Sequence, residues 1–420
     1  MNMPRVAFFT DSFHEVNGVA LTSREFARFA REKEYPFLSV HVGPETRHWT
    51  EGDFQTLELK NSWAVVQLDT NLAFDLLFMR HLQRLRTVLK QFRPDLVHIT
   101  GPGHCGILGA ILAHQVNVPL VASWHTNVHE FAGRRLARLL HTIPAELRQQ
   151  ACRIAEQGCL DLISRFYRLA RLCFAPNPEL VNMLKARTGR PTHLMLRGID
   201  SNLFSPTHRH RSDADFVIGY VGRLSPEKNV RALVEVERGL AQAGIENYRF
   251  LVVGDGSQRR RLASKLSKRE LPGTLRGEDL SRAYASMDAF VFPSETDTFG
   301  NVVLEAMSSG VPVIVSAKGG PKYLIRPGLD GFLAEKPDQF VTSLLDLYRD
   351  AELRKQMSAN ARQGALAFSW TAVFDGVYRQ YHYAATSGAL SHAGWAIRHG
   401  STFPRRPSAR PVVRNSAYSR

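Results

Sequence analysis

The amino-acid sequence predicts an α/β protein built from two units of parallel sheet and helix. Its 420 residues exceed what one ordinary core accommodates and suit two or three domains. Hydrophobic residues make up 44% and charged residues 22%, a balance typical of soluble globular proteins. Short runs rich in Val, Ile and Phe alternate with longer helical patterns along most of the chain. Continuously apolar strands joined by helices indicate parallel sheets that are covered on both faces.

Each predicted strand is a short apolar run bounded by Gly, Pro, Asn or Asp. The first half of the chain holds five of them, at Val6–Thr10, Phe37–Val42, Leu96–Thr100, Pro119–Trp124 and Leu172–Pro176. The second half holds four, at Phe216–Val221, Arg249–Val253, Ala289–Pro293 and Pro312–Val315. Helical patterns fill the gaps between several of these runs, so the length divides into two α/β units.

Pattern and composition divide the chain into five segments. Residues 1–195 are predicted to form the first α/β unit, and residues 196–215 a polar linker without periodicity. Residues 216–367 are predicted to form the second unit. Residues 368–386 contain a last helical pattern, from Trp370 to Tyr383. Residues 387–420 carry six Arg and no acid, which predicts a disordered basic tail.

Charge, cysteine content and hydropathy narrow the class of protein. The formal net charge is +15, which suits nucleic acid, an anionic membrane surface or a phosphorylated substrate without choosing among them. The four cysteines form no CxxC pair and have no His at zinc-site spacing, so we expect free thiols in a reducing cytosol. No run reaches the roughly 18 apolar residues of a membrane span, and the N-terminus lacks the layout of a signal peptide. We therefore expect a cytoplasmic protein.

The sharpest motif is Gly222-Arg223-Leu224-Ser225-Pro226-Glu227-Lys228-Asn229, directly after the predicted strand Phe216–Val221. Gly222 ends the strand, and Arg223 and Lys228 place two cations five residues apart in the loop before a helix. Ligands of open α/β sheets bind at the carboxyl ends of strands, where loop amides and helix N-termini attract anions. Arg forks onto a phosphate, and Lys adds a point charge. The motif predicts an anion site, with a solvated turn of scattered charges as the alternative.

A second motif runs from Phe292 to Met307, where a strand leads through Ser, Thr and Gly into a helix that opens near Gly300. Asp297 and Glu305 stand eight residues apart, one before the helix and one a turn or two inside it. Carboxylates in these places can accept hydrogen bonds from sugar or ribose hydroxyls beside phosphates held by basic loops. The alternative is that Asp297 caps the helix and Glu305 is a buried structural carboxylate.

Together these two motifs resemble the retaining glycosyltransferases of family 4. Their GT-B fold has two facing Rossmann-like domains with a cleft between them and a C-terminal helix that crosses back. The resemblance extends over nearly the whole chain. The chain is most similar to the bacterial GDP-mannose-dependent mannosyltransferase-like branch, which carries the Thr-Asp-Thr-Phe-Gly sequence found here at residues 296–300. Five further stretches carry the resemblance: Thr10-Asp11-Ser12-Phe13-His14-Glu15-Val16-Asn17-Gly18-Val19, Trp124-His125-Thr126, Leu196-Arg197-Gly198-Ile199-Asp200, Val253-Gly254-Asp255-Gly256 and Gly310-Val311-Pro312-Val313.

The resemblance implies a role for each matching residue of the second unit. Arg223 and Lys228 would bind the donor diphosphate, Glu305 the nucleotide ribose and Asp297 the donor sugar. The backbone of the segment that follows Asp297 would contact the donor at Phe299, Gly300 and Asn301. Most members have Glu at the position of Asp297, and many have an acid or a small residue at the position of Lys322. Both departures lie at the sugar end of the site.

In the first unit the resemblance implies that Gly18 approaches the donor phosphates across the cleft and that His125 lies near the reacting sugar. The catalytic residues would then be His125, Asp297, Arg223 and Lys228. His129 and Glu130 follow closely and could face the acceptor, although loop residues of these types are more often structural or exposed.

The reaction that the resemblance implies is the transfer of a hexose, with mannose favoured, from a nucleotide diphosphate-sugar to a lipid-linked or glycan acceptor. The donor would be GDP-mannose or a UDP-sugar. Configuration would be retained, and a diphosphate oxygen would help to deprotonate the acceptor on the same face of the sugar. Neither a metal ion nor an organic cofactor is implied. We expect no nucleic-acid partner.

Two other functions stay open at this point. A nucleotide-sugar epimerase shares the fold but lacks the combination of Arg-x4-Lys with Asp-x7-Glu. A non-catalytic basic protein that binds nucleic acid or membrane would suit the charge, although no helix-turn-helix, RNP-like aromatic pattern or zinc finger is present.

Two further short motifs are weak evidence for a ligand site. Gly101-Pro102-Gly103-His104-Cys105-Gly106 fits a dinucleotide fingerprint, but the acid expected about 20 residues later is missing, so we expect this loop to line the acceptor side. Asp213-Ala214-Asp215 is a lone D-x-D in the predicted linker, where solvated acids are the simpler interpretation.

Residues 131–173 carry eight Arg against three acids, with apolar residues interleaved at helical spacing. Arg134, Arg135 and Arg138 belong to this stretch. The pattern is typical of a helix that lies on an anionic bilayer, here the inner face of the cell membrane. The solvated face of an ordinary domain helix is the alternative.

Overall fold

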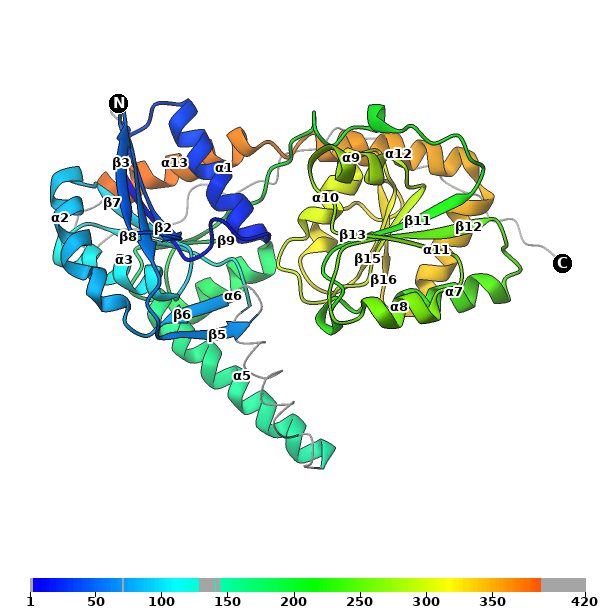
Figure 1. Ribbon diagram of the computed structural model, residues 1–420, viewed down its shortest axis with the longest axis horizontal. Helices are drawn as coiled ribbons and strands as arrows, with labels where there is room; N and C mark the ends of the chain where they lie inside the picture. Colours follow the sequence, from blue (N-terminus) through cyan, green and yellow to red (C-terminus); the bar gives the residue numbers. More distant parts are fainter. Residues whose placement is uncertain (1–2, 70–71, 128–139, 141–143, 387–420) are drawn as a thin grey trace. The chain divides into compact units, whose positions relative to one another are not determined.

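The structure, a computed structural model, describes residues 3–69, 72–127, 140 and 144–386 (Figure 1). The chain divides into two compact units. The N-terminal unit runs to Gly198 and includes helix α13 (Trp370–Thr386), and the C-terminal unit runs from Ile199 to Ser369. The predicted basic tail, residues 387–420, lies outside the described residues.

The N-terminal unit is built on an eight-stranded sheet with the order β10-β9-β8-β7-β1-β2-β4-β3. Neighbouring strands pair in parallel except β3 and β4, which are antiparallel. The strands are β1 (Val6–Thr10), β2 (Phe37–Gly43), β3 (Arg47–Glu51), β4 (Phe54–Lys60), β7 (Leu96–Ile99), β8 (Leu120–Ser123), β9 (Leu172–Ala175) and β10 (Thr192–Leu194). A separate antiparallel pair consists of β5 (Val65–Asp69) and β6 (Leu72–Asp75).

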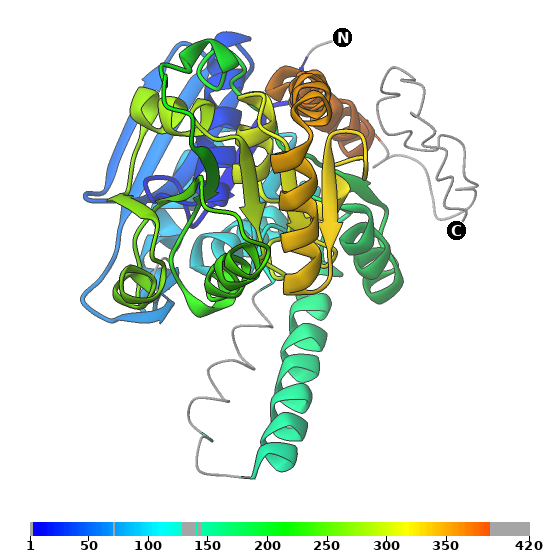
Figure 2. The same cartoon turned by 90° about the vertical axis from the view of Figure 1, so that its right-hand side faces the viewer.

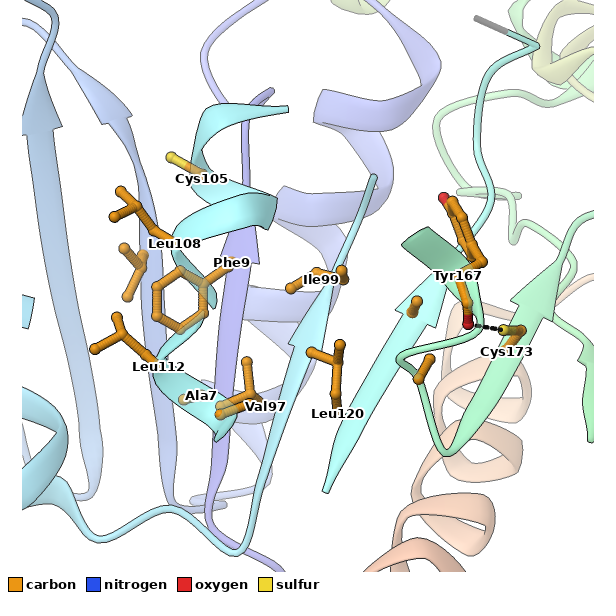
Figure 3. Close-up of a cluster of buried hydrophobic side chains, with 14 of the residues drawn as sticks. Ala7, Phe9, Val97, Ile99, Cys105, Leu108, Leu112, Leu120, Tyr167 and Cys173 are labelled. Atoms are coloured by element: carbon orange, nitrogen blue, oxygen red, sulfur yellow. Dashed lines mark hydrogen bonds between the residues drawn. The ribbon is translucent and has the colours of Figure 1, made fainter. Parts of the chain in front are cut away.

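Both faces of this sheet are buried around its central strand β1, which explains why that strand is continuously apolar. Successive side chains of a strand point to opposite faces, so Val6 and Phe8 of β1 join one apolar cluster while Ala7 and Phe9 join the other. Figure 3 shows Phe9 packed with Leu108 and other side chains of the second cluster. Four helices contribute to that cluster: α2 (Leu82–Phe92), α3 (His104–Gln115), α5 (Ala145–Tyr167) and α6 (Pro178–Thr188).

Helix α13 covers the opposite face together with α1 (Gly18–Glu32). The ring of Phe374 stacks on Phe26 of α1 with centroids 4.5 Å apart. Tyr381 is fully buried, and its hydroxyl is hydrogen-bonded to Nδ1 of His98 in β7. The last helical pattern of the sequence therefore does form a helix, and that helix returns to the N-terminal unit, as the GT-B resemblance predicted.

The C-terminal unit is built on a six-stranded parallel sheet with the order β13-β12-β11-β14-β15-β16. Its strands are β11 (Phe216–Val221), β12 (Tyr248–Val253), β13 (Arg269–Gly273), β14 (Ala289–Phe292), β15 (Val313–Ser316) and β16 (Gly331–Ala334). The helices are α7 (Ala232–Gln242), α8 (Arg259–Lys265), α9 (Gly277–Ala285), α10 (Asn301–Ser308), α11 (Pro337–Arg349) and α12 (Ala351–Ala365). In chain order within the unit the strands read 3-2-1-4-5-6, the doubly wound order of nucleotide-binding domains.

The strand order determines where a ligand can bind in each unit. In a doubly wound sheet the chain adds strands first on one side of the first strand and then on its other side. The connections therefore diverge beside the first strand, and a crevice opens at its carboxyl end. In the C-terminal unit this switch point lies between β11 and β14, and in the N-terminal unit it lies between β1 and β7. The two sharp sequence motifs directly follow β11 and β14.

Among the helices of the described ranges, none is both long enough and apolar enough to cross a bilayer.

Cys105 and Cys173 are buried in the cluster of Figure 3. Burial raises the pKa of the Cys173 thiol to about 12, which keeps this side chain protonated.

Candidate active site

The loop after β11 is held in place by the loop after β12. The amide of Gly222 donates to the Val253 carbonyl at 3.0 Å, and the amide of Leu224 donates to the Asp255 carbonyl at 2.8 Å. Gly254 has φ +134°, and a Cβ there would lie 2.0 Å from the Gly222 carbonyl oxygen. Only glycine permits this backbone and this approach. The stretch 253–256 therefore fixes the path of the chain that carries Arg223 and Lys228.

The loops after β11 and β14 contact each other directly, which brings the two predicted motifs together. Lys228 Nζ lies 2.6 Å from Asp297 Oδ1. Thr296 donates through its hydroxyl to the Glu227 carbonyl at 3.2 Å, and the Asn229 side chain donates to the Pro293 carbonyl at 3.4 Å. The sequence predicted both Lys228 and Asp297 as site residues but not the ion pair that joins them.

Asp297 has one oxygen occupied and one without a partner. Oδ1 accepts from Lys228, whereas Oδ2 is buried and has no hydrogen-bond partner among the described residues. A buried oxygen without a donor costs free energy, and such groups in native proteins commonly await a ligand or water. The alternative that Asp297 caps the helix is wrong, because the residue at the N-cap of α10 is Gly300.

Arg223 is also accompanied by an acid. Its Nη1 lies 3.8 Å from Glu227 Oε1, and the Ser225 hydroxyl donates to the same oxygen at 2.6 Å. Below the loop, the buried Tyr220 donates through its hydroxyl to the Arg223 carbonyl at 3.2 Å. About one third of the Arg223 side chain is exposed. Two cations, each beside a carboxylate, thus stand at the end of β11.

Glu305 lies inside α10 and is held by a residue that the sequence analysis did not single out. The hydroxyl of Tyr284, a fully buried residue of α9, donates to Glu305 Oε2 at 2.8 Å. Burial raises the pKa of the Glu305 carboxyl to about 7, although the Tyr284 hydrogen bond acts in the opposite direction. The carboxyl is therefore an acceptor whose charge changes near neutral pH. Tyr284 stands 21 residues before Glu305, so only the packing of α9 on α10 reveals the pair.

The start of α10 is shaped by the loop after β15. Gly300 has φ +94°, and a Cβ there would lie 2.8 Å from Pro321 Cγ. The amide of Gly320 donates to the Asp297 carbonyl at 2.6 Å. The Phe299 side chain is buried, so Phe299 can offer only backbone groups to a ligand, and Asn301 opens the helix. The Lys322 ammonium lies 5.0 Å from the Tyr323 ring centroid in this supporting loop.

In the N-terminal unit, the loop that leads to Gly18 meets the loop after β7. Asn17 caps α1 by accepting the Ala20 amide at 2.8 Å, so Gly18 is the first residue of the helix. Asp11 accepts the Cys105 amide at 2.8 Å, and a Cβ at Gly103 would lie 2.3 Å from Asp11 Oδ2. This close approach explains Gly103 of the apparent dinucleotide fingerprint, and the Gly101 carbonyl oxygen, 1.8 Å from where a Cβ would lie, explains Gly106.

His125 lies just beyond β8 and is almost completely buried. Arg197, which follows β10, donates through Nη2 to His125 Nδ1 at 2.5 Å. Burial, the Arg197 charge and the nearby His98 together hold the pKa of His125 well below its usual range. The sequence indicated Arg197 only as part of the matching stretch 196–200, and the structure adds its contact with His125.

Several other predicted residues have a simpler explanation or cannot be placed. His129, Glu130, Arg134, Arg135 and Arg138 lie outside the described residues. Asp213 and Asp215 accept hydrogen bonds from Arg249 at 2.9 and 3.0 Å, so the D-x-D motif is an ion-paired turn.

Among the described residues of the N-terminal unit, two groups could hold a metal ion: Asp11 with His104 and Cys105, and His14 with His41 and Glu58. The carboxylate in each group already has a partner. Asp11 accepts the Cys105 amide, and Glu58 lies 3.1 Å from Arg47 Nη2. Hydrogen bonding and ion pairing therefore account for both groups.

Comparison with known proteins finds two matching family models. Residues 206–364 match the model described as glycosyl transferases group 1, and residues 16–203 match glycosyltransferase family 4. A GDP-mannose-dependent alpha-mannosyltransferase of Mycobacterium tuberculosis is 33% identical over 315 residues, which cover 73% of this chain and 76% of the relative. The sulfoquinovosyl transferase SQD2 of Arabidopsis thaliana is 31% identical over 323 residues, which cover 72% and 59% of the two chains.

A solved structure, the sucrose-phosphate synthase of Thermosynechococcus elongatus, is similar with a TM-score of 0.67 and 19% identity. The match covers 90% of this chain and 99% of that one. At this identity the likeness concerns the fold, and it includes both units.

Proposed function

The chain belongs to glycosyltransferase family 4 and has the GT-B fold, and from this premise we propose that it transfers mannose from GDP-mannose to a lipid-linked or glycan acceptor with retention of configuration. The observation that carries the proposal is the Lys228–Asp297 pair at the switch point of the C-terminal unit, with Asp297 Oδ2 left without a partner. A cation for the diphosphate and an acceptor for a sugar hydroxyl stand there side by side. The mannosyltransferase relative supports mannose as the sugar.

Departure of the nucleoside diphosphate is the step that these residues would assist. Negative charge grows on the diphosphate as the glycosidic bond breaks, so Arg223, Lys228 and the amides at the start of α10 stabilise the transition state more than the bound donor. Before the donor arrives, Glu227 and Asp297 hold the two cations near their working positions. Glu305 accepts hydrogen bonds from the ribose hydroxyls.

Retention is proposed from the resemblance to the retaining enzymes of family 4, and the contacts of the site carboxylates favour a route without a covalent intermediate. Asp297 binds Lys228 through Oδ1, Glu227 binds Ser225 and Glu305 binds Tyr284, which makes each of them a weak candidate for a nucleophile toward the anomeric carbon. An oxygen of the leaving diphosphate then takes the proton of the acceptor hydroxyl on the face from which the diphosphate departs. The acceptor oxygen forms its new bond to the anomeric carbon on that same face.

The donor is tested by thermal unfolding of the full chain with GDP-, UDP- and ADP-sugars. GDP-mannose is expected to raise the midpoint most, because a ligand that binds only the folded state at about 100 times its Kd adds about 2.7 kcal/mol. Slow release of free mannose from GDP-mannose should accompany binding. Interconversion of nucleotide sugars would indicate the epimerase instead. Salt-sensitive RNA binding without donor turnover would indicate the non-catalytic protein.

Glu305→Gln is expected to raise KM for GDP-mannose more than it lowers kcat, since a ribose contact is similar in the ground and transition states. The pKa of about 7 adds a pH signature: as pH rises from about 6 to about 8, Glu305 ionises and accepts better, so the wild-type KM falls. In Glu305→Gln the KM stays flat. The exposed Glu235→Gln on α7 is the control and keeps the wild-type trend.

The same carboxyl affects stability in the opposite direction. Its folded-state pKa lies above the ordinary glutamate value of 4.5, so the wild type loses stability as the pH rises from 4.5 to about 7. Glu305→Gln lacks this loss. If the KM of Glu305→Gln for GDP-mannose still fell as the pH rises, Glu305 would not be part of the ribose site.

A lipid-linked acceptor is supported by the exposed apolar side chains of α5, the helix that extends away from the sheet of its unit (Figure 2). Leu147, Ile154 and Leu162 are 60%, 66% and 69% exposed. Their spacing of seven and eight residues puts them on one helix face. Arg153 and Arg165 are exposed on the same helix, and basic residues near an anionic surface each contribute about 1 kcal/mol.

Replacing Ile154 and Leu162 with Ser is therefore expected to lower co-sedimentation with anionic vesicles while donor hydrolysis stays unchanged. Arg134, Arg135 and Arg138 replaced with Ser are expected to act in the same direction, and wild-type binding should fall as salt screens the charges. Leu366→Ser, at an exposed position of the C-terminal unit, is the matched control. Wild-type protein that stays in the supernatant at low salt would favour a soluble acceptor.

A further inference from the structure

The contact between Arg197 and His125 joins two loops that emerge from the same edge of the N-terminal sheet. His125 follows β8 and Arg197 follows β10, with β9 lying between these strands in the sheet. Their exposed fractions are 8% and 4%. Arg197 Nη1 donates to the carbonyls of Met195 and Leu196 at 3.2 and 3.4 Å, so its own loop fixes the guanidinium. Nη2 is then directed at His125 Nδ1, 2.5 Å away.

The chemistry of the two groups decides which ring nitrogen carries the proton. A guanidinium has only donors, so the nitrogen that faces it must accept with its lone pair. In a neutral imidazole the proton then lies on Nε2. The Arg197 charge also opposes a second proton, in addition to the effect of burial.

His98 acts on the pKa of His125 in the same direction as Arg197. His98 in β7 is itself buried, with its ring bonded to the Ser123 hydroxyl at 2.5 Å, and burial lowers its pKa to about 3. Tyr167 of α5 donates its hydroxyl to the Ser123 carbonyl at 2.9 Å.

We propose that Arg197 is a positioning residue that keeps His125 as a neutral ring with its proton on Nε2, so that His125 acts as a hydrogen-bond donor and not as a base. The proposal rests on the proposed function and deepens it. A ring fixed in this state has no lone pair to offer on the Nε2 side. The acceptor proton must therefore go elsewhere, in accordance with the diphosphate oxygen as its recipient.

The state of His125 can be measured without any substrate. In the full chain labelled with ¹⁵N-histidine, the His125 signals are expected to show a proton on Nε2 and none on Nδ1, unchanged from about pH 5 to about pH 8. In Arg197→Met the ring stays buried but loses the donor that faces Nδ1, so the proton is expected to be shared between Nδ1 and Nε2 instead of lying on Nε2 alone. A wild-type His125 that carries its proton on Nδ1, or that titrates in this range, would overturn the proposal. The wild-type spectrum alone tests the proposal, even if Arg197→Met does not fold.

Arg362→Met is the matched control, because Arg362 is another arginine whose guanidinium donates to backbone carbonyls. Its Nη1 donates to the Phe204 and Ser308 carbonyls at 2.7 and 2.6 Å. Arg362 belongs to the C-terminal unit, so removing it is expected to affect stability and leave the His125 signals unchanged. A changed proton position on His125 in Arg362→Met would mean that general destabilisation, not Arg197, controls the ring.

Kinetics provide the second test. Arg197→Met is expected to lower kcat for donor turnover on the order of 10²-fold, as loss of ring orientation commonly does. The same substitution in a His125→Ala background should cost little more, because Arg197 acts through His125. Arg197→Lys keeps a cationic donor and should retain more activity than Arg197→Met. Equal losses with and without His125 would contradict the proposal, whereas a wild type that turns over no nucleotide sugar contradicts only the proposed function.

Discussion

Replacing Arg223 or Lys228 with Ala is expected to lower kcat/KM for the nucleotide-sugar donor by about 100-fold or more in each variant. Each substitution removes a cation that we propose stabilises the leaving diphosphate. Lys228→Ala should be the more damaging, because it also leaves the Asp297 carboxylate without its partner 2.6 Å away. That uncompensated anion would repel the diphosphate.

The pairing of Lys228 with Asp297 makes a sharper comparison possible. Asp297→Asn added to Lys228→Ala removes the uncompensated charge, so the double variant should bind the donor better than Lys228→Ala alone. Arg282→Ala on α9 is the control, since the ion pairs of this arginine within the described residues are i,i+3 and i,i+4 pairs on its own helix, with about half of its side chain in solvent. The kcat and KM of all four variants are measured by steady-state kinetics with the true donor. Unchanged kcat and KM in Arg223→Ala or Lys228→Ala would show that the diphosphate binds elsewhere.

Phe374→Ala is expected to destabilise the protein by about 3–5 kcal/mol, the usual cost of removing a buried aromatic side chain. Phe374 is fully buried and lies between two rings, Phe26 at 4.5 Å and Trp370 at 5.4 Å between centroids. The alanine leaves a cavity between α13 and α1, which neither helix can close without moving.

Urea unfolding followed by circular dichroism measures this cost. Tyr383→Ala, on the same helix but 38% exposed, is the matched control and should cost a small part of it. If the two variants were equally stable, α13 would not be part of the core of the N-terminal unit.

The strands that the sequence predicted are those buried on both faces. In β1, β11 and β14 every side chain is buried, so the apolar run is continuous and needs no knowledge of neighbouring strands. Strand β4 was missed because its run is broken by polar residues. Thr56 and Glu58 are buried within it, and Glu58 is paired there with Arg47, His14 and His41. Strand β13 was missed because it is a largely exposed edge strand that contains Pro272.

The position of the site could be predicted for a related reason. Parallel strands end at a common edge, so residues that directly follow them are brought together whatever the distance along the chain. Which residues pair at that edge depends on strand order and loop path. Lys228 and Asp297 are 69 residues apart and His125 and Arg197 are 72 apart, so no local pattern links either pair. The same holds for Tyr284 and Glu305, which meet only because α9 packs on α10.

The configuration of the sugar product tests the central claim most directly. GDP-mannose supplied as the α-anomer is followed by ¹H NMR during transfer, and during slow hydrolysis before the free sugar equilibrates. A product that forms first as the α-anomer is what the account predicts, since bond breaking and bond making share one face with the diphosphate held by Arg223 and Lys228. A product that forms first as the β-anomer would contradict it, because inversion requires a base on the opposite face.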